Sequence, residues 1–174
     1  MNAIILYGSQ YGAAKRYADA LASTTGIIAE PYRTKRNISG YDTVIYFGGL
    51  YAGRVTGLAK TAARLSEGQS FIIATVGLAD PDAGANTEAI RASVRKQVPD
   101  WLYAQVRLFF LRGGIDYQAL HLRHRAMMWA FRRILLKTPP GERTPETKAI
   151  LDTYGQKVDF VDLSRLHEIE KVIL

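Results

Sequence analysis

A short stretch near the N-terminus, Gly8–Ala14 (GSQYGAA), has the residue types that can hold a phosphate group. It follows the apolar run Ala3–Tyr7 and leads directly into a segment with apolar residues at helical spacing. A loop at this junction presents backbone N–H groups at a helix N-terminus, where an anion binds without cationic side chains. Ser9 and Gln10 add polar side chains. The alternative is an ordinary tight turn between a strand and a helix.

The elements around this loop predict an α/β fold. Five runs read as strands, namely Ala3–Tyr7, Gly26–Tyr32, Thr43–Phe47, Phe71–Val76 and Val106–Leu111. Helical patterns cover Leu58–Leu65, Tyr117–Lys137, Pro145–Tyr154 and Leu163–Lys171. A further helix is expected to begin with Asn86 as its N-cap and to extend to Val98. Strands that alternate with helices predict a parallel sheet covered on both faces. At 174 residues, the chain is expected to form a single domain over residues 1–174.

Two further glycine-containing loops, Gly48–Gly57 and Gly77–Gly84, follow the third and fourth predicted strands. In open parallel sheets, ligands bind outside the carboxyl ends of the strands. We therefore expect these loops to face the first one across a ligand site. The first loop lacks the glycine spacing of a dinucleotide-binding fingerprint and the Gly-Lys-Ser/Thr of a P-loop.

Three of these stretches resemble flavodoxins. ILYGSQYGAAKRYADALA is similar to the flavodoxin phosphate loop, YDTVIYFGGLYAGRVTGLAK to the third strand and flavin wall, and FIIATVGLAD to the fourth strand and its flavin loop. The resemblance implies a three-layer fold with strand order 2-1-3-4-5 and non-covalently bound FMN. The cofactor-binding residues that it implies are Ser9, Gln10, Tyr11, Gly12, Ala13, Ala14, Gly49, Leu50, Tyr51, Ala52, Gly53, Val76, Gly77 and Leu78.

The C-terminal stretch from LFFLRGGIDYQALHLRHRAMMWAFRRILLK to about Phe160 is similar to the quinone-linked (menaquinone-dependent) protoporphyrinogen dehydrogenases. These are flavodoxin-fold FMN enzymes with a basic, aromatic-bearing segment after the fifth strand. The resemblance implies an oxidoreductase that takes electrons from an anionic tetrapyrrole and passes them to a quinone. The alternatives are an electron-transfer protein or quinone reductase with another partner, and a binding module that has lost FMN. No catalytic acid or base is assigned.

The chain departs from the flavodoxin pattern at two places. Tyr11 and Ala14 stand where flavodoxin phosphate loops usually carry threonines. Hydrogen bonds to charged groups are worth about 1.5–3 kcal/mol, so backbone N–H groups, Lys15 or Arg16 must compensate. The loop VGLADPDAG also lacks an aromatic residue, which leaves Tyr51 as the residue expected to stack on the ring.

The predicted helix Tyr117–Lys137 combines an apolar stripe with five basic residues and no acid between Asp116 and Glu142. The stripe consists of Met127, Ala130, Phe131, Ile134 and Leu135, and the basic residues are Arg123, Arg125, Arg132, Arg133 and Lys137. Such a helix is typical of proteins that bind to an anionic membrane surface. A docking face for an acidic substrate, or a helix packed on the sheet with a solvated basic side, remains open. His121 and His124 share a face but lack the further ligands of a metal site.

The composition of the chain favours some classes of partner and excludes some kinds of chemistry. The formal net charge of +7 favours anionic partners, yet no nucleic-acid-binding motif accompanies it. Because cysteine is absent, disulfides, thiolate catalysis and cysteine-ligated iron–sulfur clusters are excluded, and any redox chemistry needs a bound cofactor. No apolar run approaches the roughly 18 residues of a membrane span, and no signal peptide is recognisable. The expected location is the cytoplasm. The basic helix adds the expectation of peripheral attachment to the inner face of the cell membrane.

Overall fold

The central sheet of the computed structural model, which describes residues 2–82 and 84–173, confirms the predicted α/β fold. Its parallel strands are β1 (Ala3–Gly8), β2 (Ala29–Pro31), β3 (Thr43–Tyr51), β5 (Ser70–Gly77) and β6 (Arg107–Arg112), in the order β2-β1-β3-β5-β6. The five parallel strands thus follow the predicted order 2-1-3-4-5. The short strand β4 (Arg54–Val55) adds an antiparallel partner to the end of β3.

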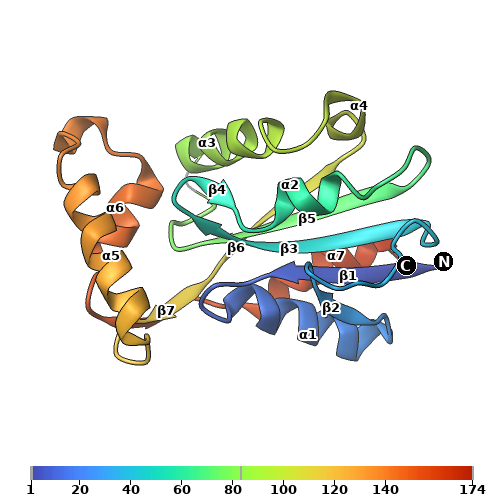
Figure 1. Cartoon of the computed structure of the whole chain (residues 1–174), viewed down its shortest axis with the longest axis horizontal. Helices are drawn as coiled ribbons and strands as arrows, with labels where there is room; N and C mark the ends of the chain where they lie inside the picture. The colour runs from blue at the N-terminus through green and yellow to red at the C-terminus, as the bar shows by residue number, and fades with distance from the viewer. Residues whose placement is uncertain (1, 83, 174) are drawn as a thin grey trace.

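Helices cover both faces of this sheet (Figure 1). α1 (Ala13–Thr25) and α7 (Leu166–Ile173) lie on one face, and α2 (Leu58–Ala62), α3 (Gly84–Arg95) and α4 (Asp100–Tyr103) lie on the other. Alternate residues of β1 and β3 point to opposite faces, so Ile5 and Ile45 enter one hydrophobic core while Leu6 and Tyr46 enter the other. We call this sandwich the body.

A second group of elements lies beyond the carboxyl ends of the strands (Figure 1). It consists of β7 (Gly114–Asp116), α5 (Leu122–Leu135), the 3-10 helix η1 (Pro140–Glu142), α6 (Pro145–Asp152) and β8 (Lys157–Asp159). β7 and β8 pair antiparallel and form a ribbon that leads out of the body and back. We call residues 114–159 the cap. The chain then re-enters the body through η2 (Leu163–Arg165) and α7.

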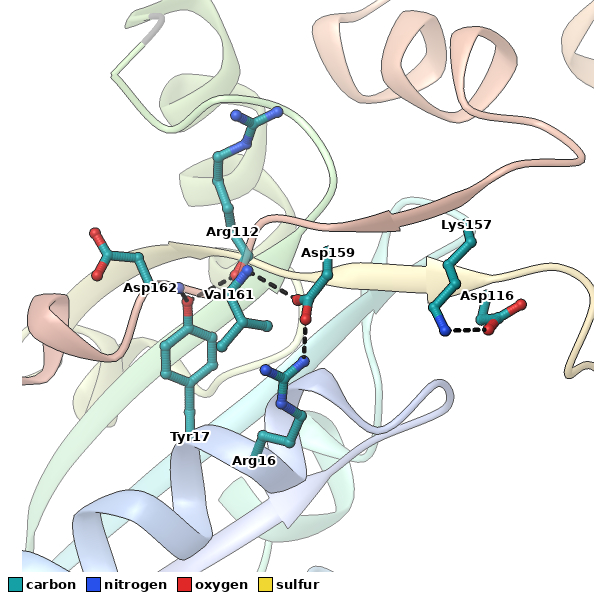
Figure 2. Close-up of polar contacts among 8 residues, drawn as sticks. All are labelled: Arg16, Tyr17, Arg112, Asp116, Lys157, Asp159, Val161 and Asp162. Carbon is teal, nitrogen blue, oxygen red and sulfur yellow. Dashed lines mark hydrogen bonds and ion pairs between the residues drawn. The ribbon is translucent and has the colours of Figure 1, made fainter.

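The root of the cap is tied to the body by polar contacts (Figure 2). The buried Tyr17 hydroxyl of α1 donates to the carbonyl oxygen of Arg112 at 2.8 Å and accepts from the N–H of Asp162 at 2.9 Å. Arg16 pairs with Asp159 at 2.8 Å, and Lys157 pairs with Asp116 across the ribbon at 3.2 Å. Helix α1 therefore holds both chain segments at the point where the cap leaves and rejoins the body.

Several predicted elements have different bounds. The segment expected to be helical from Tyr117 begins as a helix only at Leu122, because the Asp116 carboxylate accepts the N–H groups of Gln118 and Ala119 and forms a turn. Asn86 is not a helix cap: α3 begins at Gly84, and buried Asn86 donates to the carbonyl oxygen of Asp80.

At the edges of the fold the differences are smaller. The second predicted strand shortens to Ala29–Pro31, since Gly26 ends α1 in the left-handed region at φ 72°. The last predicted helix divides into η2 and α7. Across the described residues, no helix has the length and apolar character needed to cross a bilayer.

Candidate functional site

A crevice lies where the cap meets the carboxyl ends of β1, β3 and β5. Its cavity volume, with the cap in place, is about 50 Å³. The three loops of the sheet contribute Ser9, Gln10, Tyr11, Ala13, Ala14, Gly49, Leu50, Tyr51, Ala52, Val76, Gly77 and Leu78, and the rest of the lining is Gly113, Gly114, Ile115, Met128, Phe131, Glu146 and Ile150. The lining is mainly apolar, with polar groups concentrated at its two ends.

The loop after β1 forms one end of the crevice. Gly12 adopts φ 91°, a conformation that side chains disfavour, and open space lies where a Cβ would be. The Ser9 hydroxyl accepts the N–H of Gly12 at 3.0 Å and fixes the loop. The next N–H groups, of Ala13, Ala14 and Lys15, belong to the first turn of α1 and have no intrahelical acceptor.

The charges in the first turn of α1 do not oppose the binding of an anion there. The first turn of α1 contains no acidic residue. The ammonium group of Lys15 pairs with Asp19 at 2.5 Å, and the guanidinium of Arg16 pairs with Asp159. Both cations are thus engaged elsewhere, so backbone N–H groups and the helix dipole provide the attraction for an anion.

A tight hairpin between β3 and β4 forms the wall of the crevice. Leu50 pairs with Val55 and Tyr51 with Arg54, and the turn residues Ala52 and Gly53 have φ values of 49° and 73°. Positive φ at both central positions is the requirement of a type I′ turn. Ala52 is unusual there, since a non-glycine residue in this region carries a strain of order 1 kcal/mol or more. Ser93 of α3 donates to the Gly53 carbonyl oxygen at 2.6 Å and supports the turn.

The Tyr51 ring lies at the centre of an aromatic cluster. Its centroid is 6.4 Å from that of Tyr11 in an edge-on arrangement and 6.0 Å from that of Phe131 in the cap. The Tyr11 hydroxyl donates to the Met128 sulfur at 3.0 Å, and burial raises the pKa of that hydroxyl. Loop, wall and cap therefore meet around Tyr51, and the cap covers the crevice from the outside.

The other end of the crevice lies at the loop after β5. The Glu146 carboxylate, which projects from the first turn of α6, accepts the N–H of Leu78 at 3.1 Å and the N–H of Ala79 at 3.0 Å. Burial raises the pKa of this carboxyl group. A Cβ at Gly77 would lie 2.7 Å from the Leu50 Cδ1 and 3.0 Å from the Glu146 Oε2, so glycine permits this close packing.

Helix α5 turns only one side toward the crevice. His124, Met128 and Phe131 share that side, and the Gln10 amide lies within 3.3–3.4 Å of the His124 ring nitrogens. The predicted apolar stripe is divided, because Phe131 contacts Tyr51 while Met127, Ala130 and Ile134 are exposed. The alternative of a helix packed on the sheet is wrong, since α5 lies in the cap.

The structure brings together all but two of the residues expected from the sequence. Gly12 and Gly53 are absent from the lining, although Gly12 shapes the first loop and Gly53 borders a second groove. That groove lies between the hairpin, α3 and α6 and includes Ala89, Ile90 and Ile150. Sequence reasoning missed Glu146 and the cap side chains Met128 and Phe131, which no local pattern marks as crevice residues.

The family model of the flavodoxin domain matches residues 4–140, more than half of the chain. The chain belongs to the flavodoxin domain family.

Two solved structures are similar to part of this chain. One, from Bacteroides eggerthii, is described as a putative flavoprotein, is 14% identical and has a TM-score of 0.46 over 63% of this chain and 85% of its own. The other, from Bacteroides uniformis and described in the same words, is 10% identical with a TM-score of 0.45 over 75% and 97%. The comparison with curated proteins found no match.

Proposed function

We propose that this chain binds FMN non-covalently in the crevice between body and cap and acts as a flavin-dependent oxidoreductase. The observation that carries the proposal is the pairing of an acid-free helix N-terminus with an aromatic wall in one crevice. Family membership supports the same ligand class. The helix end suits a phosphate, and the wall suits a planar ring.

The residues present fit this cofactor. The N–H groups of residues 13–15 would hold the phosphate, and the open space at Gly12 permits close approach. Tyr51 and Leu50 would contact the ring from the hairpin. When bound, FMN supplies hydride and single-electron chemistry, and the chain contains no cysteine that could supply thiol redox chemistry instead.

The protein's own contribution is to position the ring and to exclude water. Phe131 and Met128 of the cap lie against Tyr51 and Tyr11 and close the crevice from outside. A shielded, low-dielectric crevice strengthens the electrostatic contacts made inside it. No side chain in the lining is assigned as a proton donor or acceptor for the reaction.

A fluorescence titration tests FMN binding directly. Addition of the wild-type protein should quench FMN fluorescence and saturate at one flavin per chain, because Tyr51 would stack on the ring. Tyr51→Ala should restore much of the fluorescence of the bound flavin. Tyr103→Ala, a tyrosine on α4 outside the crevice, serves as the matched control. Absence of quenching by the wild-type protein would contradict the proposal.

For the reaction, we propose electron transfer from an anionic tetrapyrrole, of the protoporphyrinogen type, to a quinone. The resemblance of the segment after β6 to the quinone-linked dehydrogenases supports this choice. The groove between the hairpin, α3 and α6 lies beside the crevice and includes the apolar residues Ala89, Ile90 and Ile150, so we place the contact with a second apolar molecule there. Turnover of protoporphyrinogen with a menaquinone analogue tests it. Reduction of the bound flavin by another donor, with no protoporphyrinogen turnover, would favour an electron carrier or another quinone reductase.

We further propose that α5 places the protein against an anionic membrane surface. Its exposed side carries Leu122, Met127, Trp129 and Ile134, with Leu136 directly after it, and α5 contains no acidic residue. Arg133 lies 5.0 Å from the Trp129 ring centroid. Arg132 does not count toward this side, because its guanidinium lies over the Tyr154 ring. Each basic residue near an anionic surface contributes about 1 kcal/mol, so the four exposed basic residues Arg123, Arg125, Arg133 and Lys137 suffice for reversible attachment.

Vesicle sedimentation tests the membrane proposal. Wild-type protein should sediment with phosphatidylglycerol vesicles, less so as salt rises, and should ignore phosphatidylcholine vesicles. Combined charge reversal at the exposed Arg123, Arg133 and Lys137 should abolish sedimentation. The same reversal at Lys60, Arg95 and Lys96, which are exposed on the body, is the matched control. If wild-type protein ignores anionic vesicles, the basic side serves a substrate or protein partner instead.

A further inference from the structure

Glu146 is the acidic residue in the lining of the crevice, and it comes from the cap. Its two carboxylate oxygens divide their bonds between two N–H groups: Oε1 accepts from Leu78 and Oε2 from Ala79. Both donors follow β5, some 67–68 residues earlier in the chain. The contact therefore joins α6 of the cap to the sheet at the inner end of the crevice.

Among the residues that the structure describes, no cation forms an ion pair with this carboxylate. The positive charge of Arg112 acts on this carboxylate from a distance. The Arg112 guanidinium donates its hydrogen bonds to the Leu78 carbonyl oxygen at 3.2–3.3 Å and not to Glu146. A carboxylate offers about four lone-pair sites, and the part of the chain that the structure describes fills two of them. Half-burying a carboxylate while part of its acceptor capacity is unused carries a desolvation cost, which a further hydrogen bond would offset. Such a group is suited to receive a further hydrogen bond from a ligand.

The topology fixes which part of a ligand would meet Glu146. β3 lies between β1 and β5, so the loops after β1 and β5 are separated by two strand spacings, about 10 Å. The phosphate loop follows β1 and Glu146 sits at the loop after β5. A ligand with its phosphate on α1 and its ring along the β3 hairpin would present the far edge of that ring to Glu146.

We propose that Glu146 is the specificity-determining residue at the ring end of the crevice, where its carboxylate accepts a hydrogen bond from an imide N–H of a planar heterocycle. This inference rests on the proposed FMN function and deepens it. Oxidised flavin has one ring N–H, at N3, between two carbonyl groups. A group that only accepts selects for that N–H, and it rejects rings that present an acceptor or a methyl group in its place.

A comparison of FMN with FMN methylated at N3 tests this role, because a merely structural glutamate would not distinguish them. Wild-type protein should bind the methylated flavin at least tenfold more weakly than FMN. Glu146→Ala should bind the two within about twofold of each other. Glu142→Ala removes an exposed acid of the same segment and should keep the wild-type ratio. If Glu146→Ala does not fold, Glu146→Gln, which keeps the side-chain size, replaces it and should reduce the ratio.

Two outcomes overturn the inference while FMN binding stands. Equal binding of both flavins by the wild-type protein would show that N3–H does not meet Glu146. Tighter FMN binding by Glu146→Ala would show that the carboxylate competes with the flavin for the N–H groups of Leu78 and Ala79. Failure of the wild-type protein to bind FMN at all is a different result, which would remove the proposed function and this inference with it.

Discussion

The body and the cap of this molecule are built with very different amounts of buried apolar surface. In the body, β1, β3 and β5 contribute side chains to two cores, and residues such as Ile5, Tyr46 and Phe47 are fully buried. In the cap, α5 buries Met128 alone, and α6 has no buried residue among those described. Regions with few buried contacts open at low free-energy cost. We therefore expect the body to fix the loops of the crevice and the cap to open at lower free-energy cost when a ligand enters.

The largest expected effect is a loss of stability on truncating a core side chain, and it should be larger in the body than in the cap. Phe47→Ala removes a fully buried ring that stacks on Tyr17 at 6.3 Å, and it should lower the free energy of unfolding by about 3–5 kcal/mol. Phe131→Ala removes a half-buried ring of the cap and should cost less than half as much. Urea denaturation of both variants measures the difference. Equal losses would mean that the cap is as firmly packed as the body.

An intermediate effect is expected at the root of the cap. Tyr17→Phe keeps the ring but removes the hydroxyl that joins the Arg112 carbonyl to the Asp162 N–H. Because both hydrogen bonds are only part-buried, losing them should cost about 1–2 kcal/mol. Amide hydrogen exchange should also accelerate in α5 and α6 more than in β3. Unchanged exchange in the cap would show that this hydroxyl does not control its opening.

A smaller loss of stability is expected at acidic pH. The hydrogen bond from Arg16 holds the pKa of Asp159 below its ordinary value of 3.8, so the folded state gains stability above that value. This gain is lost as the pH falls below 3.8 toward the lower folded pKa. Because the pair is about half exposed, the loss should be below about 1 kcal/mol.

Unfolding of Asp159→Asn at pH 6 and pH 3 checks this sign. The variant should lose less stability than the wild-type protein over that interval, and Asp100→Asn, an exposed aspartate of α4, should lose as much as the wild type. A greater acid loss in Asp159→Asn than in the wild-type protein would contradict the assignment.

The body was predictable from the sequence because its strands are local apolar runs and its glycine loops sit between them. The order of the parallel strands followed from the resemblance to flavodoxins. β4 was missed, since Ala52-Gly53 lacks the asparagine or aspartate that usually marks such a turn. The β7–β8 ribbon was missed because its two short strands are more than forty residues apart and become strands only by pairing.

The candidate site was predictable where it depends on the sheet and unpredictable where it depends on the cap. Ser9 and Tyr51 directly follow or end apolar runs, so their place at the carboxyl edge is a local property. Glu146 looks like an ordinary acid in the first turn of a helix, where the dipole favours it. Its contact with Leu78 and Ala79 arises from the path of the cap, which local patterns do not encode.

The central claim is that the phosphate of FMN lies at the N-terminus of α1 while the body and cap enclose the ring, and calorimetric titration with FMN and with riboflavin tests it most directly. Riboflavin lacks the phosphate, so it should bind at least tenfold more weakly than FMN. Gly12→Val should reduce this preference, because a branched side chain would fill the open space at φ 91°. Gly26→Val imposes similar backbone strain at the other end of α1 and should leave the preference intact. Equal affinities of the wild-type protein for the two flavins, or no binding of either, would contradict the account.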